Sequence, residues 1–149
     1  ALLRPVEPLA PAAVAGFRAR APFPGDAVAV AGFPYGDTLV RPVLTFGTVA
    51  GSGGLGGEGG LRRLDLATRP GYAGGPVLDE AGAVVGMLLA PPKGQALPGA
   101  ASLALGGEVI VDALQRAGIP AAAAPNGVPL EPEQLARERA GLAVLVSCW

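Results

Sequence analysis

The chain has 149 residues, of which half are hydrophobic, and its eleven basic and twelve acidic residues leave a net charge of −1. This length suits one modest domain. The near-neutral charge offers no field to attract phosphate backbones or anionic lipid, which argues against nucleic acid as a partner. The sequence holds no run of about 18 apolar residues, which argues against a membrane span.

The first 24 residues predict a connection rather than a helix. Prolines stand at positions 5, 8, 11, 22 and 24, and proline removes a backbone donor and breaks helices. We therefore expect residues 1–24 to run extended over the surface of the following domain.

The next part of the chain reads as a set of short antiparallel strands. The whole chain holds twenty-four glycines and sixteen prolines, far above ordinary usage and without a repeating period. Apolar and β-branched stretches between them predict strands over Asp26–Phe33, Leu39–Ala50, Leu61–Thr68, Pro76–Leu78, Ala83–Leu89 and Ala101–Leu105. A turn over residues 79–82 opens on aspartate and closes on glycine, as a short hairpin requires. We expect residues 25–118 to form an all-β unit.

After the strands, helical periodicity appears twice. Glu108–Ala117 places apolar side chains on one face and ends before a glycine, which predicts a capping helix. Residues 119–131 form an Ala/Pro-rich linker, and 132–149 predict a tail with a helix over Pro132–Ala140 and a strand over Leu142–Trp149. The single cysteine, Cys148, has no partner for an internal disulfide; it is either an unpaired thiol or bonds to something outside the chain.

Cofactor and metal motifs are weak. Residues 51–56 match a dinucleotide-binding glycine pattern, but no helix follows to receive a pyrophosphate, so we expect a hairpin loop. The chain has no histidine and one cysteine, a poor set of ligands for a metal site. We predict neither a cofactor nor a metal.

The most informative stretch is 69–87, which begins Arg-Pro-Gly-Tyr-Ala-Gly-Gly-Pro and continues through a hairpin into Val-Val-Gly-Met. It resembles the nucleophile loop of trypsin-like serine proteases, whose pattern is Gly-x-Ser-Gly-Gly-Pro. Glycines permit a tight turn whose backbone N–H groups converge into an oxyanion hole. The resemblance implies a hole at Gly71, Tyr72 and Ala73, with Ala73 at the position of the nucleophile. A methyl group cannot attack a carbonyl, so we expect no hydrolysis by the chain as written.

The resemblance covers most of residues 1–118. Residues 24–34 and 45–49 are similar to strands of the second barrel in bacterial periplasmic heat-shock proteases, and 101–117 to their last strand and helix. It implies an all-β fold: the second six-stranded antiparallel barrel of a chymotrypsin-like double barrel, with a C-terminal helix and here an extra tail strand. The segment from Ala1 resembles the one following the catalytic aspartate, which implies an upstream N-terminal barrel as a partner and a periplasmic or secreted location.

The resemblance also implies where a peptide would bind. The strand that pairs with an extended substrate falls on Leu88, Leu89, Ala90 and Pro91, and Pro91 cannot donate a main-chain hydrogen bond. The floor of the primary specificity pocket falls near Ala67 and Thr68, so the pocket would favour small or apolar side chains. Tyr72 replaces a small polar or acidic residue of the family, and its ring could partly block the hole.

Three functions remain open on these observations. The first is a non-catalytic trypsin-like module, a pseudopeptidase that binds a peptide or protein or acts as a scaffold. The second is an active serine endopeptidase inactivated by alanine at position 73, with its histidine and aspartate on an upstream segment. The third is an adaptor whose tail strand docks on another sheet, because an unpaired apolar strand seeks a sheet edge.

Overall fold

The computed structural model describes residues 2–7, 10–11, 13–36, 41–91 and 101–146. The strands are β1 (Gly16–Phe17), β2 (Ala27–Gly32), β3 (Val43–Ser52), β4 (Leu61–Asp65), β5 (Pro76–Asp79), β6 (Val84–Leu88), β7 (Ala101–Gly106) and β8 (Ala122–Ala123). The helices are α1 (Gly107–Arg116), α2 (Pro132–Arg139) and the short 3₁₀ helix η2 (Ala140–Leu142). Among these described helices, none is both long and apolar enough to cross a membrane.

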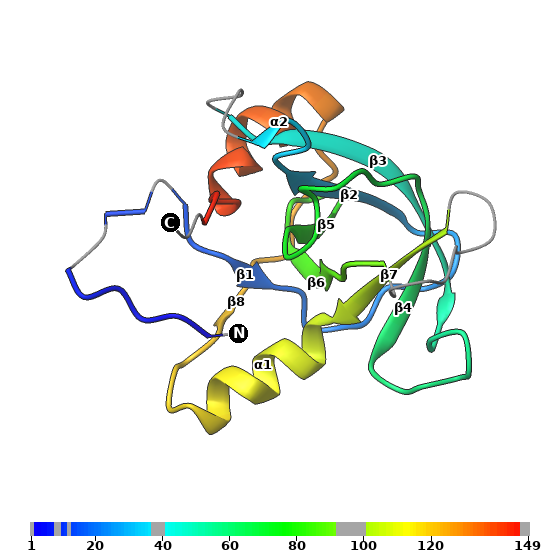
Figure 1. Cartoon of the computed structure of the whole chain (residues 1–149), viewed down its shortest axis with the longest axis horizontal. Coiled ribbons are helices and arrows are strands. Elements are labelled where there is room, and N and C mark those ends of the chain that lie inside the picture. The colour runs from blue at the N-terminus through cyan, green and yellow to red at the C-terminus, as the bar shows by residue number, and fades with distance from the viewer. Residues whose placement is uncertain (1, 8–9, 12, 37–40, 92–100, 147–149) are drawn as a thin grey trace.

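Strands β2 to β7 close into a barrel (Figure 1). The order β5-β2-β3-β4-β7-β6 is antiparallel throughout, and β5 also pairs with β6, which joins the two ends of the sheet. The predicted six-stranded antiparallel barrel with a following helix is therefore confirmed. The expected strand over Leu39–Ala50 falls partly on residues 37–40, which lie outside the described part.

The barrel interior is filled by aliphatic side chains and one tyrosine. β7 alternates strictly between buried and partly exposed residues, as a strand with one face on a core does. β2 is buried on both faces from Val28 to Gly32, because other segments cover its outer face. The core cluster comprises Val28, Val30, Val49, Leu64, Leu66, Tyr72, Val77, Val85, Leu88 and Ala104.

The hairpin between β5 and β6 forms as the sequence predicts. The Asp79 carboxylate accepts hydrogen bonds from the N–H groups of Ala81 (3.0 Å) and Ala83 (2.8 Å). Gly82 closes the turn with φ +79° and donates its N–H to the Asp79 carbonyl. This is the Asx-type turn that an aspartate before glycine favours, and it fixes the register of the strand leaving the nucleophile loop.

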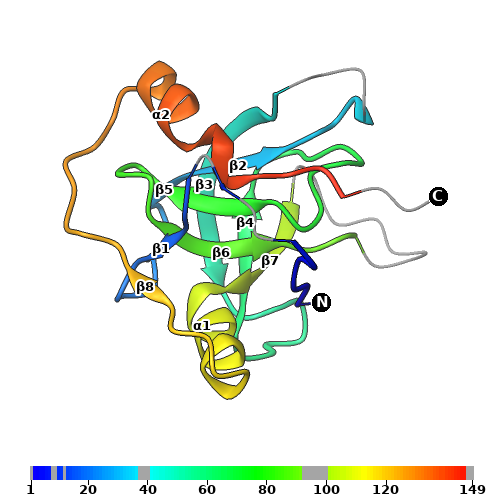
Figure 2. The same ribbon diagram turned by 90° about the vertical axis from the view of Figure 1, so that its left-hand side faces the viewer.

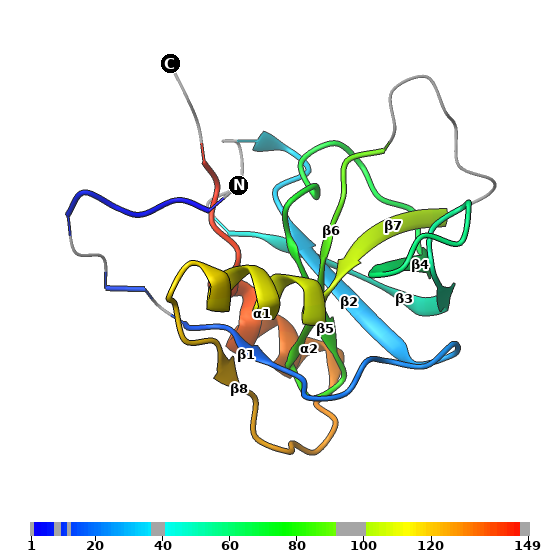
Figure 3. The same cartoon turned by 90° about the horizontal axis from the view of Figure 1, so that it is seen from below.

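Two short strands were not foreseen. β1 lies inside the expected connection and β8 inside the expected linker, and they pair in parallel with Gly16 opposite Ala122. β1 also pairs with β6 through Phe17 and Val84. Figure 3 shows β1 and β8 side by side, and in Figure 1 they lie between α1 and α2. Both segments are therefore attached to the barrel, and their two-residue length explains why no periodic pattern marks them.

The tail returns to the barrel in a way that the sequence did not predict. α2 carries the capping box of Glu131 and Gln134, and its Leu135 is buried against the β2 side of the barrel. In Figure 2, α2 lies over β2 and β3, and α1 lies at the opposite end. The expected strand after Leu142 is wrong over residues 143–146, which form no strand; Ser147, Cys148 and Trp149 lie outside the described residues.

Replacing Leu135 tests whether α2 belongs to the folded unit. Leu135→Ala removes a side chain that is only 3% exposed, so we expect a loss of about 2 kcal/mol in unfolding free energy and faster hydrogen exchange in α2. Glu138→Ala, on an exposed position of the same helix, should change stability by less than about 0.5 kcal/mol. Denaturant titration would contradict the packing if both variants behaved alike.

Candidate functional site: the nucleophile loop

The site is built on the loop that joins β4 to β5, residues 67–75, which we call the nucleophile loop. Its position is set by backbone hydrogen bonds on two sides. Phe33 at the end of β2 donates its N–H to the Gly71 carbonyl (2.9 Å), while Gly74 donates to the Leu88 carbonyl (2.8 Å) and Leu88 donates to the Gly75 carbonyl (2.9 Å). The loop is thus fixed between the ends of β2 and β6.

Gly71 lies in close contact with the end of β2. Its φ is +97°, a conformation that residues with a Cβ rarely adopt. A Cβ placed on it would lie 2.1 Å from the Phe33 carbonyl oxygen. Glycine is therefore required here by both the backbone conformation and the close approach of β2.

The resemblance places the oxyanion hole at this loop, and two of its backbone N–H groups there have no acceptor within the part of the chain that the structure describes. They belong to Gly71 and Ala73, while the intervening Tyr72 donates its N–H to the Arg69 carbonyl (3.3 Å). Gly71 and Ala73 are both exposed, so their N–H groups are free to meet a ligand. Paired free donors of this kind suit a carbonyl oxygen or an oxyanion. The Ala73 side chain supplies only a methyl group.

The Tyr72 ring, which the resemblance allowed to block part of the hole, lies in the barrel core instead. The residue is 4% exposed and belongs to the barrel core, and its hydroxyl oxygen accepts a hydrogen bond from Thr45 of β3 (2.7 Å). A large aromatic side chain gains most by burial when its hydroxyl finds a partner. Tyr72 therefore anchors the loop from inside the barrel.

The expected substrate strand continues β6, and its hydrogen bonds alternate between two edges. The Leu88 N–H points to the nucleophile loop, and the N–H of Leu89 points the other way, to the Leu103 carbonyl of β7 (2.8 Å). Alternation along an extended chain puts the next N–H toward the loop side on Ala90 and the nitrogen of Pro91 on the β7 side. The effect of Pro91 on a bound peptide stays a prediction; by this alternation its nitrogen faces the β7 side.

The structure separates Ala67 from Thr68, which the resemblance placed in one pocket. The Thr68 hydroxyl lies 3.0 Å from the Ser102 hydroxyl, which in turn donates to the Leu66 carbonyl (2.9 Å). Ala67 instead lines a cavity on the other side of the loop. Neither residue carries a charge, so the part of the site they form remains apolar or neutral.

That cavity was missed by the sequence reasoning. It has a volume of 350 Å³ and is lined by Pro34, Tyr35, Val43, Thr45, Ala67, Arg69 and Tyr72. Its residues come from the β2–β3 connection, β3 and the nucleophile loop, so no single stretch of sequence reveals it. Arg69, a cation two residues before Gly71, was the one signal available in the sequence.

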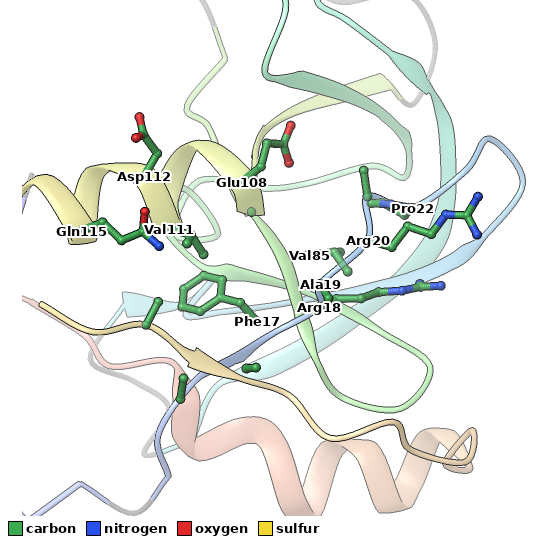
Figure 4. A pocket seen from close by; sticks show the side chains of 15 residues that line it. Phe17, Arg18, Ala19, Arg20, Pro22, Val85, Glu108, Val111, Asp112 and Gln115 are labelled. Atoms are coloured by element: carbon green, nitrogen blue, oxygen red, sulfur yellow. The ribbon is translucent and has the colours of Figure 1, made fainter.

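A second cavity, of 290 Å³, lies between α1 and the N-terminal segment, away from the nucleophile loop (Figure 4). Phe17 faces Val111 and Gln115 across it. The acidic residues at its rim, Glu108 and Asp112, form ion pairs with Arg62 and Arg116. No group of three or more His, Cys, Asp or Glu side chains able to hold a metal occurs in the described ranges.

Comparisons with known proteins agree with this geometry. A protein of Sinorhizobium fredii, described as uncharacterized protein y4bJ, is 29% identical over 132 residues, which cover 83% of this chain and 21% of the relative. The serine endoprotease from Yersinia pestis superimposes with a TM-score of 0.55 at 19% identity, over 69% of this chain and 35% of that one. The HtrA-type protease AlgW with decapeptide gives 0.55 at 25% identity, over 69% and 32%.

The chain spans about a fifth of the curated relative and about a third of these proteases. The model of the trypsin-like peptidase domain matches residues 1–87, which run from the N-terminal segment through the nucleophile loop to β6. Since this is more than half of its length, the chain belongs to the family of trypsin-like peptidase domains.

Proposed function

We propose that this chain is a non-catalytic trypsin-like module, a pseudopeptidase that uses its nucleophile loop to bind a peptide or protein segment. The observation that carries the proposal is Ala73, an exposed residue of a loop that backbone hydrogen bonds hold to Phe33 and Leu88. A side chain with no oxygen cannot form an acyl-enzyme. The chain also lacks histidine, the usual general base for such a serine.

Binding is supported by what the loop retains. The N–H groups of Gly71 and Ala73 have no acceptor among the described residues, and Ala90 continues the edge of β6 beside them. An extended peptide could add to that edge through main-chain hydrogen bonds while one of its carbonyls meets the two N–H groups. We propose an upstream N-terminal barrel as the other wall of this site, and a periplasmic or secreted location.

The alternative function is a serine endopeptidase silenced by alanine at position 73, with histidine and aspartate on an upstream segment. It is favoured by the intact anchoring of the loop. Against it stands Tyr72, which is buried to 4% exposure and bonded to Thr45. Because the Tyr72 side chain is packed in the core and hydrogen-bonded, the loop differs from the family pattern at Tyr72 as well as at Ala73. This favours a loop that departs from the protease pattern at more than the nucleophile position.

The decisive experiment compares the full-length protein with its Ala73→Ser variant on unfolded protein and on small apolar peptides. We expect neither to hydrolyse them, while both remain folded by circular dichroism. A silenced enzyme would behave differently, because loss of the triad costs on the order of a million-fold in turnover. Hydrolysis restored by serine and abolished by a general serine-protease inhibitor would establish the alternative.

A third function, an adaptor acting through the tail, has one supporting observation. Val144, Leu145 and Val146 are 76%, 45% and 63% exposed, and a run of exposed apolar side chains is typical of a contact surface. This function predicts association that depends on the tail and is indifferent to Ala73. Deletion of residues 143–149 separates this function from the loop-based proposal. The measurement is association of the full-length protein with its partner, which the deletion should abolish if the tail is the contact surface.

A further inference from the structure

The cavity beside the nucleophile loop presents hydrogen-bond donors. Arg69 donates from Nη1 to the Tyr35 hydroxyl oxygen (3.2 Å), and Thr45 donates to the Tyr72 hydroxyl oxygen (2.7 Å). Each phenol is therefore an acceptor in its recorded bond and keeps its own O–H proton to donate. Together with the remaining N–H groups of the guanidinium, these phenols line a cavity of 350 Å³.

The cavity is also positively charged. Its lining residues include one arginine and no acidic side chain, and Arg69 makes no ion pair with a carboxylate of the described residues. Arg69 shares this with other arginines of the described residues, such as Arg20 and Arg137, whereas Arg18, Arg62 and Arg116 lie near carboxylates. What distinguishes Arg69 is its position: it is the one charged residue among those that line the cavity.

The volume and the lining residues of the cavity indicate which class of ligand it suits. Pro34, Val43 and Ala67 supply apolar walls, and a volume of this order holds a residue or two of a peptide. A planar guanidinium with nearby O–H donors matches the two oxygens of a carboxylate. The cavity begins at Arg69, two residues before Gly71, so a peptide engaged at the oxyanion-hole N–H groups could reach it.

We propose that this cavity is a carboxylate subsite, in which Arg69, Tyr35 and Tyr72 bind the carboxylate of a peptide ligand. The subsite rests on the proposed peptide-binding function and specifies its ligand class. The carboxylate comes either from an acidic side chain or from a peptide C-terminus, and both have the same chemistry.

The test measures binding of fluorescent hexapeptides to the full-length protein by anisotropy. The probes are a peptide of alanine and valine with capped ends and one central glutamate, the same peptide with glutamine, and the glutamine peptide with a free C-terminal carboxylate. We expect at least one carboxylate probe to bind roughly tenfold more tightly than the capped glutamine peptide. Whichever carboxylate probe gains affinity identifies the source.

The same probes are then applied to variants. Arg69→Gln should abolish the preference for carboxylate, Arg69→Lys should keep part of it, and Arg137→Gln, on an exposed position of α2, should leave it unchanged. Thermal melts confirm that each variant is folded. Equal binding of acidic and neutral peptides, or a preference that survives Arg69→Gln, would overturn the subsite while peptide binding stands. If no peptide binds, the proposed function fails and the subsite with it.

Discussion

Gly71→Ala is expected to destabilise the domain by about 3 kcal/mol or more and to disorder the nucleophile loop. The added Cβ would lie 2.1 Å from the Phe33 carbonyl oxygen and 3.1 Å from the Pro34 Cα. Both are backbone atoms at the end of a barrel strand, so neither can move without loosening β2. The backbone conformation adds to this cost, since φ at Gly71 is +97°. Denaturant titration measures the loss.

Gly74→Ala is the matched control, because it lies in the same loop and also has a positive φ, of +83°. No atom lies within 4 Å of a Cβ built there, so only the conformational strain of about 1–2 kcal/mol remains. The difference between the two variants isolates the contact with β2. Equal losses would show that the loop does not depend on the approach of Phe33.

Much of the barrel could be predicted from sequence because the signals are local. Strand ends coincide with glycine, proline and aspartate, and the Asp79 turn forms as its residue types require. The nucleophile loop was located from its glycine pattern, and Gly71 takes the positive φ that favours glycine in a tight turn. These features depend on residues within a few positions of one another.

The remaining features depend on contacts between distant segments. β1 and β8 are two residues each and exist only as partners of one another and of β6, so neither has a periodicity of its own. The tail after Leu142 has an apolar, β-branched composition, yet it finds no strand to pair with over residues 143–146. Propensity for a strand is satisfied only where a sheet edge is available.

The candidate site likewise depends on contacts between distant segments, which the sequence alone does not reveal. Motif reasoning placed Tyr72 correctly in the loop, but the sequence could not show that its ring turns inward to meet Thr45, 27 residues away. Nor could it show that the N–H groups of Leu88 and Leu89 bond to opposite sides, one to the nucleophile loop and one to β7. The cavity at Arg69 is assembled from segments that only the barrel brings together.

Tyr72→Ala is expected to cost about 3–5 kcal/mol, because it removes an aromatic ring from the core. Tyr72→Phe keeps the ring and removes only the hydroxyl that bonds Thr45, so its expected cost is about 1 kcal/mol. The ring should therefore account for most of the stabilisation, and the hydroxyl for the remainder. Denaturant titrations of the two variants measure each contribution.

The effect of Tyr72→Ala on the nucleophile loop can be measured separately from its effect on global stability. If Tyr72 anchors the nucleophile loop from inside the barrel, hydrogen exchange at the amides of Gly74 and Gly75, which bond to Leu88 and Tyr72, should accelerate in Tyr72→Ala more than exchange in β7. Tyr35→Phe, at an exposed tyrosine of the same cavity, should change stability by less than about 0.5 kcal/mol. Uniform acceleration across the barrel would instead mean that Tyr72 serves the core alone, and the loop would then owe its shape to its glycines and to Phe33.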